Sequence, residues 1–220
     1  MKSLLIILGL FSYAAASFSQ DTIQSQDPAA EPYLENIAEQ FKTEDPYQVE
    51  FRYEVYSAMH DAKVSDYGSI IVKGNKYKLK TEDTRVFYNG KHLWVYNPAA
   101  GEVYKSEPVE GDPDQMLADP FRLLGNYKKY YKYLFKGEQN IAGNIYFQID
   151  LYPDNLDAGY SILRVLCTEG GSNIHSIILK QKNGTEITAY LNEIIQNINI
   201  PESTFSWDKE AHPDVLVIEM

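Results

Sequence analysis

Cysteine is almost absent from this sequence, since Cys167 is the only one in 220 residues. A single thiol excludes an internal disulfide framework, so the fold must depend on its hydrophobic core. Cys167 lies in an apolar run and is interpreted as a small apolar residue of a strand; a reactive thiol is the alternative.

Positive charge is also scarce. The chain has 20 Lys and Arg against 31 Asp and Glu, which gives a net charge of −11 and a pI near 4.8. Nucleic acids and anionic membrane surfaces select basic patches, so this balance argues against both as partners. Beyond the N-terminal region, no apolar run approaches the roughly 20 residues that a membrane-spanning helix needs.

The common motifs of catalysis and metal binding are missing as well. The four histidines include no H-x-x-x-H pair and no cysteine neighbour, and no G-x-S-x-G, P-loop or G-x-G-x-x-G motif occurs. The sequence therefore predicts a protein that is not an enzyme and has no metal or cofactor.

The N-terminus has the order of a secretory signal peptide. Lys2 precedes an apolar run from Leu4 to Phe11, and Ala14-Ala15-Ala16 offers a cleavage site. We expect a signal peptide over residues 1–19; a membrane anchor or buried helix is the alternative. Because no cysteine stands at the end of this segment, we expect an exported periplasmic protein that carries no lipid anchor.

The rest of the chain divides into a polar leader and one domain. Residues 20–30 are poor in apolar side chains and are expected to be disordered. Residues 31–220 suit a single domain of the larger all-β kind. At its start, Leu34, Ile37 and Phe41 repeat at helical spacing behind Pro32, which predicts an amphipathic helix.

After this helix the period changes to two. Tyr47, Val49, Phe51, Tyr53 and Val55 alternate with polar residues, as in an antiparallel strand with one wet face. Further strands are expected at 67–73, 76–81, 84–88, 91–96, 102–107, 130–136, 145–152, 160–168, 174–182 and 185–200. Short helices are expected within 108–127.

Turn chemistry and a change of parity complete the pattern. Asn89-Gly90 and Asn183-Gly184 are strong hairpin signals. Asn183-Gly184-Thr185 also fits an N-glycosylation site, but the turn is the preferred interpretation. In the last long strand the apolar residues move from odd positions (Ile187, Leu191) to even ones, which predicts a bulge or a bend. The fold class is mainly β with a helical lid: an incomplete antiparallel barrel of about ten or eleven strands that covers a hydrophobic cavity.

Several runs of residues, in order, resemble the LolA family of outer-membrane lipoprotein carriers of Gram-negative bacteria. They are Gly68-Ser69-Ile70-Ile71-Val72-Lys73, Tyr77-Lys78-Leu79, Asn89-Gly90-Lys91-His92-Leu93-Trp94-Val95-Tyr96-Asn97-Pro98, Asp119-Pro120-Phe121-Arg122-Leu123-Leu124, and the C-terminal segment from Ile200 to Trp207. The tryptophan hairpin is the most specific of these.

The resemblance implies a periplasmic carrier that binds the acyl chains of lipoproteins and shuttles them from the inner to the outer membrane. It implies acylated lipoproteins and an inner-membrane lipoprotein-releasing ABC transporter as partners. The outer-membrane acceptor stays unknown, and we expect a monomer. A lipid-binding or sensor module of the same fold with another lipophilic ligand is the alternative; an exported hydrolase is a more distant one.

On this basis we expect two sets of site residues. The acyl-chain cavity would be lined by Phe51, Tyr77, Leu79, Trp94 and Tyr96. The lid would be formed by Leu34, Ile37, Phe41, Met116, Leu117, Phe121 and Leu124. The alternative is that these residues are ordinary core.

One turn departs from the family. LolA proteins commonly carry an Arg-Pro pair after the Gly68 strand, and that arginine contacts the lid, whereas here Lys73-Gly74-Asn75-Lys76 occupies the turn. Lysine lacks the forked guanidinium, so replacement of this contact by Lys73 or Lys76 is an open question.

Overall fold

The computed structural model describes residues 26–41, 46–108 and 120–220. Its helices are α1 (Glu31–Gln40), α3 (Pro120–Gly125) and α4 (Tyr127–Tyr130), with 3₁₀ turns η1 (Glu169–Gly171) and η2 (Glu202–Phe205). Its strands are β1 (Tyr47–Ser57), β2 (Ala62–Lys73), β3 (Lys76–Lys80), β4 (Arg85–Tyr88), β5 (Leu93–Asn97), β6 (Glu102–Ser106), β7 (Tyr131–Ile141), β8 (Asn144–Pro153), β9 (Tyr160–Cys167), β10 (Ile174–Gln181), β11 (Thr185–Gln196) and β12 (Leu216–Glu219).

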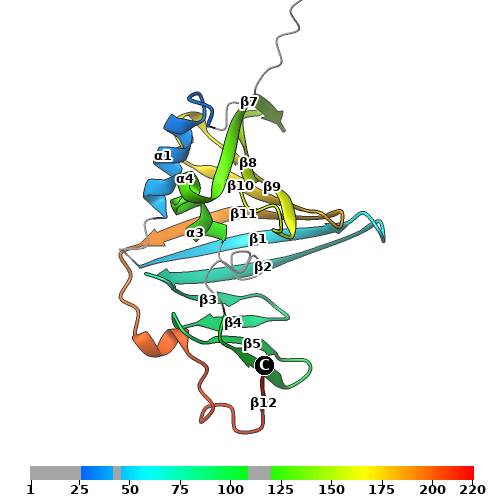
Figure 1. Ribbon diagram of the computed structural model, residues 1–220, viewed down its shortest axis with the longest axis vertical. Coiled ribbons are helices and arrows are strands. Elements are labelled where there is room, and N and C mark those ends of the chain that lie inside the picture. The colour runs from blue at the N-terminus through cyan, green and yellow to red at the C-terminus, as the bar shows by residue number, and fades with distance from the viewer. Residues whose placement is uncertain (1–25, 42–45, 109–119) are drawn as a thin grey trace, which may run out of the picture.

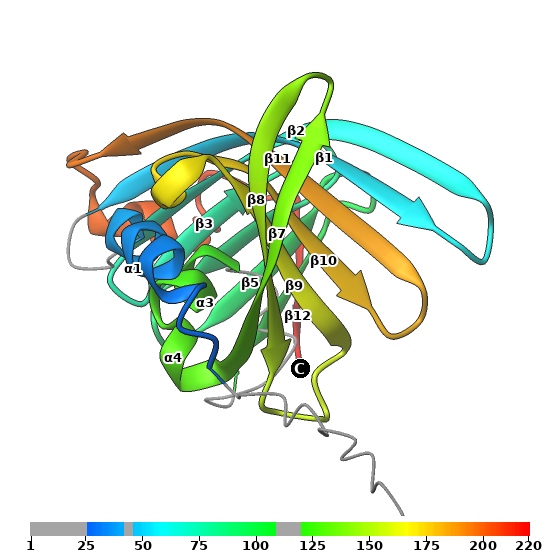
Figure 2. The same ribbon diagram turned by 90° about the horizontal axis from the view of Figure 1, so that it is seen from above.

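All the strands belong to one open sheet. Its order is β12-β6-β5-β4-β3-β2-β1-β11-β10-β9-β8-β7, so the two edge strands do not pair and the barrel stays incomplete. Neighbouring strands are antiparallel, with the single exception of the β12–β6 pair among the described residues. The sheet curls, and α1, α3 and α4 lie together beside it (Figures 1 and 2). The predicted fold class is confirmed.

The expected strands are present, and one more joins them. β12 was not predicted; it makes the sheet 12-stranded and pairs in parallel with β6, with Val217 opposite Val103. A four-residue strand that bonds to a strand more than 100 positions earlier leaves no local signal in the sequence.

The predicted bulge in the last long strand is confirmed. Along the β1–β11 pair, Glu50 faces Glu193 but the next residue, Phe51, faces Leu191. Asn192 is therefore the extra residue of β11. Its insertion keeps both the odd-numbered and the even-numbered apolar residues of this strand on the same face of the sheet.

The hairpins form where the turn residues predicted them. Gly90, with φ of 92°, and Gly184, with φ of 84°, adopt the left-handed conformation that these tight turns require. The Asn89 side chain also closes its turn, because its Oδ1 accepts a hydrogen bond from the His92 N–H at 2.9 Å. Both signals were correct because they act over a few residues.

The sheet has two faces that differ in what covers them. We call the face toward α1, α3 and α4 the inner face, and the other the outer face. The main core lies on the inner face, where Val49, Ile70, Ile149, Leu163 and Val165 share one buried cluster with the helices. A smaller cluster lies on the outer face of β4–β6 under the C-terminal segment.

Part of the expected leader is packed against the domain. Gln26 forms a bridge with Tyr133 of β7, and Asp27 Oδ2 accepts the Phe135 N–H at 3.0 Å. Ala30 is fully buried. Of the predicted disordered leader, residues 26–30 are thus placed along β7; the rest, like the expected signal peptide, lies outside the described residues.

Candidate functional site

The inner face, with the helices that cover it, is the candidate binding site. Leu34, Ile37 and Phe41 of the α1 segment and Leu124 of α3 are fully buried there, in the same cluster as Phe51 and Tyr77. Four of the expected lid residues therefore lie against the sheet in this structure. Of the others, Met116 and Leu117 lie outside the described residues, and Phe121 lies on the α3 helix.

Polar contacts hold α1 to the turn after β9. Asn36 Nδ2 donates to the Gly170 carbonyl at 2.7 Å, and Gln40 Nε2 donates to the Gly171 carbonyl at 3.0 Å. Gly171 allows this close approach, because a Cβ there would lie 2.5 Å from the Tyr33 carbonyl oxygen. The Tyr133 hydroxyl of β7 also donates to Glu31 at 3.1 Å, and Gln196 Nε2 of β11 donates to the Gln40 carbonyl at 3.2 Å, so α1 is joined to the sheet by polar contacts as well as by its apolar side chains.

Aromatic rings and charges connect the helices to β7 and β8. The Tyr33 ring of α1 lies with its centroid 5.3 Å from those of both Phe135 and Phe147. Lys128 of α4 pairs with Glu35 of α1 at 3.0 Å. The helices therefore cover the part of the inner face nearest to β7 and β8.

The other part of the inner face, on β3–β5, is less completely covered. The strand registers align Tyr77 with Tyr88 and Leu93, and Leu79 with Val95 by way of β4. Tyr77 is buried, whereas the other four are only partly buried and pack against the main core. This gives an apolar surface with some solvent access beside the helices.

Two of the five expected cavity residues lie elsewhere. Trp94 and Tyr96 belong to the outer-face cluster, and the Tyr96 ring centroid lies 4.8 Å from that of Trp207. Side chains alternate along β5, so Leu93 and Val95 are its inner-face residues. The expected set is therefore corrected: Phe51, Tyr77 and Leu79 share the inner face, and Trp94 and Tyr96 do not.

Sequence reasoning missed Tyr88, Leu93 and Val95. The signal was available in principle, because Leu93 and Val95 alternate with Trp94 and Tyr96 in an apolar run. All four positions of that run are apolar, however. Its pattern therefore could not show whether the odd-numbered or the even-numbered side chains face the helices.

The two lysines of the variant turn contact the C-terminal segment. Lys73 Nζ lies 2.8 Å from one carboxylate oxygen of Glu202, and Lys76 Nζ bonds to the other. Lys73 also donates to the Ile200 carbonyl at 3.2 Å. Hydrogen bonds from the two lysines lower the pKa of Glu202 to about 2. Among the described residues, neither lysine reaches a helix of the expected lid.

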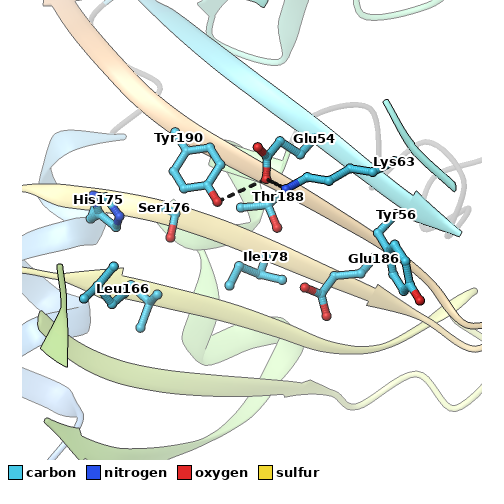
Figure 3. Close-up of a pocket in the computed structure, with 11 residues that line it drawn as sticks. Glu54, Tyr56, Lys63, Leu166, His175, Ser176, Ile178, Glu186, Thr188 and Tyr190 are labelled. Carbon is cyan, nitrogen blue, oxygen red and sulfur yellow. Dashed lines mark hydrogen bonds and ion pairs between the residues drawn. The ribbon is translucent and has the colours of Figure 1, made fainter. Parts of the chain in front are cut away.

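A hollow of about 410 Å³ lies on the outer face over β1, β10 and β11 (Figure 3). Glu54 is its central charge. Its carboxylate is bonded by Lys63 at 2.9 Å, by Arg52 at 2.6 Å and by the Tyr190 hydroxyl at 3.2 Å. Hydrogen bonds from Lys63 and Arg52 lower the pKa of Glu54 to about 2, so this carboxylate stays ionised and paired.

The charged side chains of this outer hollow are paired with opposite charges. His175 stacks on Tyr146 with ring centroids 4.2 Å apart, and burial lowers the pKa of its imidazole. Glu186 pairs with Lys180 at 2.7 Å. None of these contacts joins a nucleophile to a base in the manner of an activated hydroxyl or thiol.

The described part of the chain contains no cluster of three or more His, Cys, Asp or Glu side chains that could hold a metal ion. Within the same residues, no helix combines the length and the apolar character needed to cross a bilayer.

The fold is similar to solved structures at low sequence identity. An uncharacterized conserved protein from Thermus thermophilus superposes with a TM-score of 0.52 at 10% identity, over 87% of this chain and 99% of that one. This likeness shows the fold alone. A DUF1329 family protein from Desulfovibrio piger gives a TM-score of 0.49 at 14% identity, over 85% and 100% of the two chains. A LolA superfamily protein from Nitrosomonas europaea gives 0.45 at 15% identity, over 81% and 97%.

Sequence comparison supports the resemblance to the LolA family. No curated protein matches the chain significantly in sequence. The family model described as "Outer membrane lipoprotein carrier protein LolA" matches residues 54–157, a segment that contains the tryptophan hairpin and the inner-face strands β3–β5. The resemblance of the sequence is thereby confirmed: residues 54–157 of the chain match the model of the LolA family of outer-membrane lipoprotein carrier proteins.

Proposed function

We propose that this protein is a periplasmic carrier that binds the acyl chains of lipoproteins and shuttles them from the inner to the outer membrane without catalysing a reaction. The observation that supports this proposal is the inner face. An apolar surface on β3–β5 lies beside helices whose apolar side chains are fully buried against the same sheet. An acyl chain could bind to that surface and, by displacing the helices, extend over the rest of the inner face.

The energetics suit a carrier that must also release its cargo. Burial of an acyl chain contributes about 0.8 kcal/mol per methylene, so about twenty methylenes would give on the order of 16 kcal/mol. Leu34, Ile37 and Phe41 would each lose about 1.5–3 kcal/mol on leaving the sheet, or about 5–9 kcal/mol together. A lid of this strength offsets a large part of the gain and keeps release feasible.

The proposed partners follow from the family. Acylated lipoproteins are the cargo, an inner-membrane lipoprotein-releasing ABC transporter loads them, and an outer-membrane acceptor of unknown identity receives them from the monomer. The site residues would be Phe51, Tyr77 and Leu79 with Tyr88, Leu93 and Val95. The lid would include Leu34, Ile37, Phe41 and Leu124.

A lipid-binding or sensor module for another lipophilic ligand is the second candidate, and one observation favours it. Lys73 and Lys76, which stand where the family has its lid-contacting arginine, both bind Glu202 in the C-terminal segment. If this turn does not contact the lid as the family's arginine does, transfer of cargo to the usual partners would differ too. The apolar inner face would still bind lipid.

Native mass spectrometry of the purified protein tests the proposal. The protein is incubated with a triacylated lipoprotein and with its non-acylated cysteine variant. We expect a one-to-one complex with the acylated form alone. Absence of any complex would contradict the carrier, and a complex with an unrelated copurified lipid in its place would support the second candidate.

A pair of variants on β5 locates the site. Val95→Asp puts a charge on the inner face and should weaken acyl-chain binding at least tenfold, because an ionised carboxylate is costly in an apolar contact. Asn97→Asp adds the same charge at the exposed end of the same strand and should bind like the unmodified protein. Circular dichroism checks that both fold; equal binding by the two variants would place the acyl chain elsewhere.

A further inference from the structure

Three cations gather on the outer face of β3 and β4, away from the acyl-chain surface. Lys78 and Lys80 lie two residues apart on β3 and so share a face. Arg85 of β4 lies directly opposite Lys80 in the strand register. Like charges at directly opposed positions destabilise a sheet, so an anion bound between these cations would stabilise it.

None of the three forms an ion pair with a carboxylate among the described residues, although Lys80 also borders a hollow that Glu50, Asp66 and Glu82 line. Instead, Lys78 Nζ lies 5.2 Å from the centroid of the Phe87 ring, and Arg85 Cζ lies 5.7 Å from that of Tyr96. Several other lysines of this acidic protein do form such pairs, as Lys63 does with Glu54 at 2.9 Å. Burial first, and then repulsion by Arg85 and Lys80, lowers the pKa of the Lys78 ammonium.

The three cations line a pocket of about 330 Å³. Its opposite wall comes from η2 and the residues after it, which bring Ser203, Thr204 and Ser206 to the same space. Their hydroxyls are hydrogen-bond donors for an anion. The pocket is completed by Phe87, Trp207, Asp208 and His212.

Asp208 is the one carboxylate on this wall, and it is engaged elsewhere. Its Oδ1 accepts the backbone N–H groups of Glu210 at 2.9 Å and Ala211 at 3.0 Å, so it shapes the turn that follows η2. With three cations against this one carboxylate, the described lining of the pocket keeps a net positive charge in a chain whose overall charge is −11.

We propose that this pocket binds the phosphate group of a phosphorylated ligand. A guanidinium supplies a planar fork that matches two phosphate oxygens, and the two ammonium groups add point charges around the third. The volume exceeds that of a phosphate ion alone, so the group would be carried by a small molecule or by one phospholipid headgroup. The strong net negative charge disfavours contact with a broad anionic membrane.

Titration calorimetry at low ionic strength tests this site on the intact protein. Inorganic phosphate and glycerol 3-phosphate represent the soluble source. Cosedimentation with phosphatidylcholine vesicles that contain a minor fraction of phosphatidylglycerol, against vesicles of phosphatidylcholine alone, represents the headgroup. Arg85→Gln and Lys80→Gln are the test variants. Lys80 is exposed, so its replacement leaves the fold intact. Lys132→Gln removes the same charge from an exposed position of β7 and is the matched control.

We expect saturable binding of at least one of these probes, weakened about tenfold or more by Arg85→Gln and clearly by Lys80→Gln, and unchanged by Lys132→Gln. Binding of the soluble probes would identify a small phosphorylated ligand, and binding only to the vesicles that contain phosphatidylglycerol would identify a headgroup. Failure of all probes, or equal weakening by the control, would overturn the proposal. The acyl-chain surface lies on the other face, so the two proposals stand or fall separately.

Discussion

Replacement of Leu34 by alanine tests whether α1 acts as a lid. This side chain is 0% exposed, inside the cluster that α1 shares with the sheet. Truncation of a buried leucine to alanine costs about 2–5 kcal/mol, because apolar burial is lost and a cavity remains. The variant should therefore unfold at a lower urea concentration.

The lid hypothesis adds a second, opposite effect on ligand affinity. If loading displaces α1 from the sheet, the contacts of Leu34 exist only in the empty protein, and their loss makes opening easier. A free-energy change of about 1.4 kcal/mol is tenfold in affinity, so a loss of about 2–5 kcal/mol predicts binding that is at least tenfold tighter. If α1 is simply core, affinity should fall or stay unchanged.

The assay follows binding of a tripalmitoylated lipopeptide by native mass spectrometry, beside urea unfolding monitored by circular dichroism. Val103→Ala is the control, because Val103 is equally buried but lies in the outer-face cluster. This control should lower stability without tightening binding. A Leu34→Ala protein that is less stable and binds no more tightly than the unmodified protein would refute α1 as the lid.

Three further predictions concern stability and reactivity. Arg164 donates to the buried Asp150 carboxylate at 2.7 and 2.8 Å, so Arg164→Met should reduce the free energy of unfolding in urea by about 3–5 kcal/mol, and a second change, Asp150→Asn, should recover much of it. Burial raises the pKa of the Cys167 thiol to about 12, so a thiol reagent should modify the native protein no faster than it unfolds; rapid labelling would contradict this. The pKa of Glu202 falls from its ordinary 4.5 to about 2, so its ion pairs stabilise fully above pH 4.5 and are lost as the pH falls toward 2. Both tryptophans lie in the adjoining outer-face cluster, so their emission should shift to the red over this window, and less so in Glu202→Gln.

Local signals in the sequence predicted most of the fold. The helical spacing of Leu34, Ile37 and Phe41 predicted α1, and Asn-Gly pairs predicted the tight hairpins, because both depend on contacts within a few residues. The parity change along β11 predicted its bulge, since every apolar residue of that strand must reach the same core.

The candidate site was less predictable. The run Leu93-Trp94-Val95-Tyr96 is apolar at every position, and either parity could have faced the helices. Trp94 and Tyr96 were misplaced because the outer face of β5 is also apolar, under a C-terminal segment that arrives from more than 100 residues away.

The sequence by itself determined the strands, the turns and the leading helix, because periodicity and turn chemistry act locally, and its motifs carried the resemblance to the LolA family. Only the tertiary structure decided which face of the sheet the helices cover, that β12 pairs with β6, and that Lys78, Lys80 and Arg85 converge beside η2. These features depend on contacts between residues that are distant in the chain, and a sequence carries no local record of such contacts.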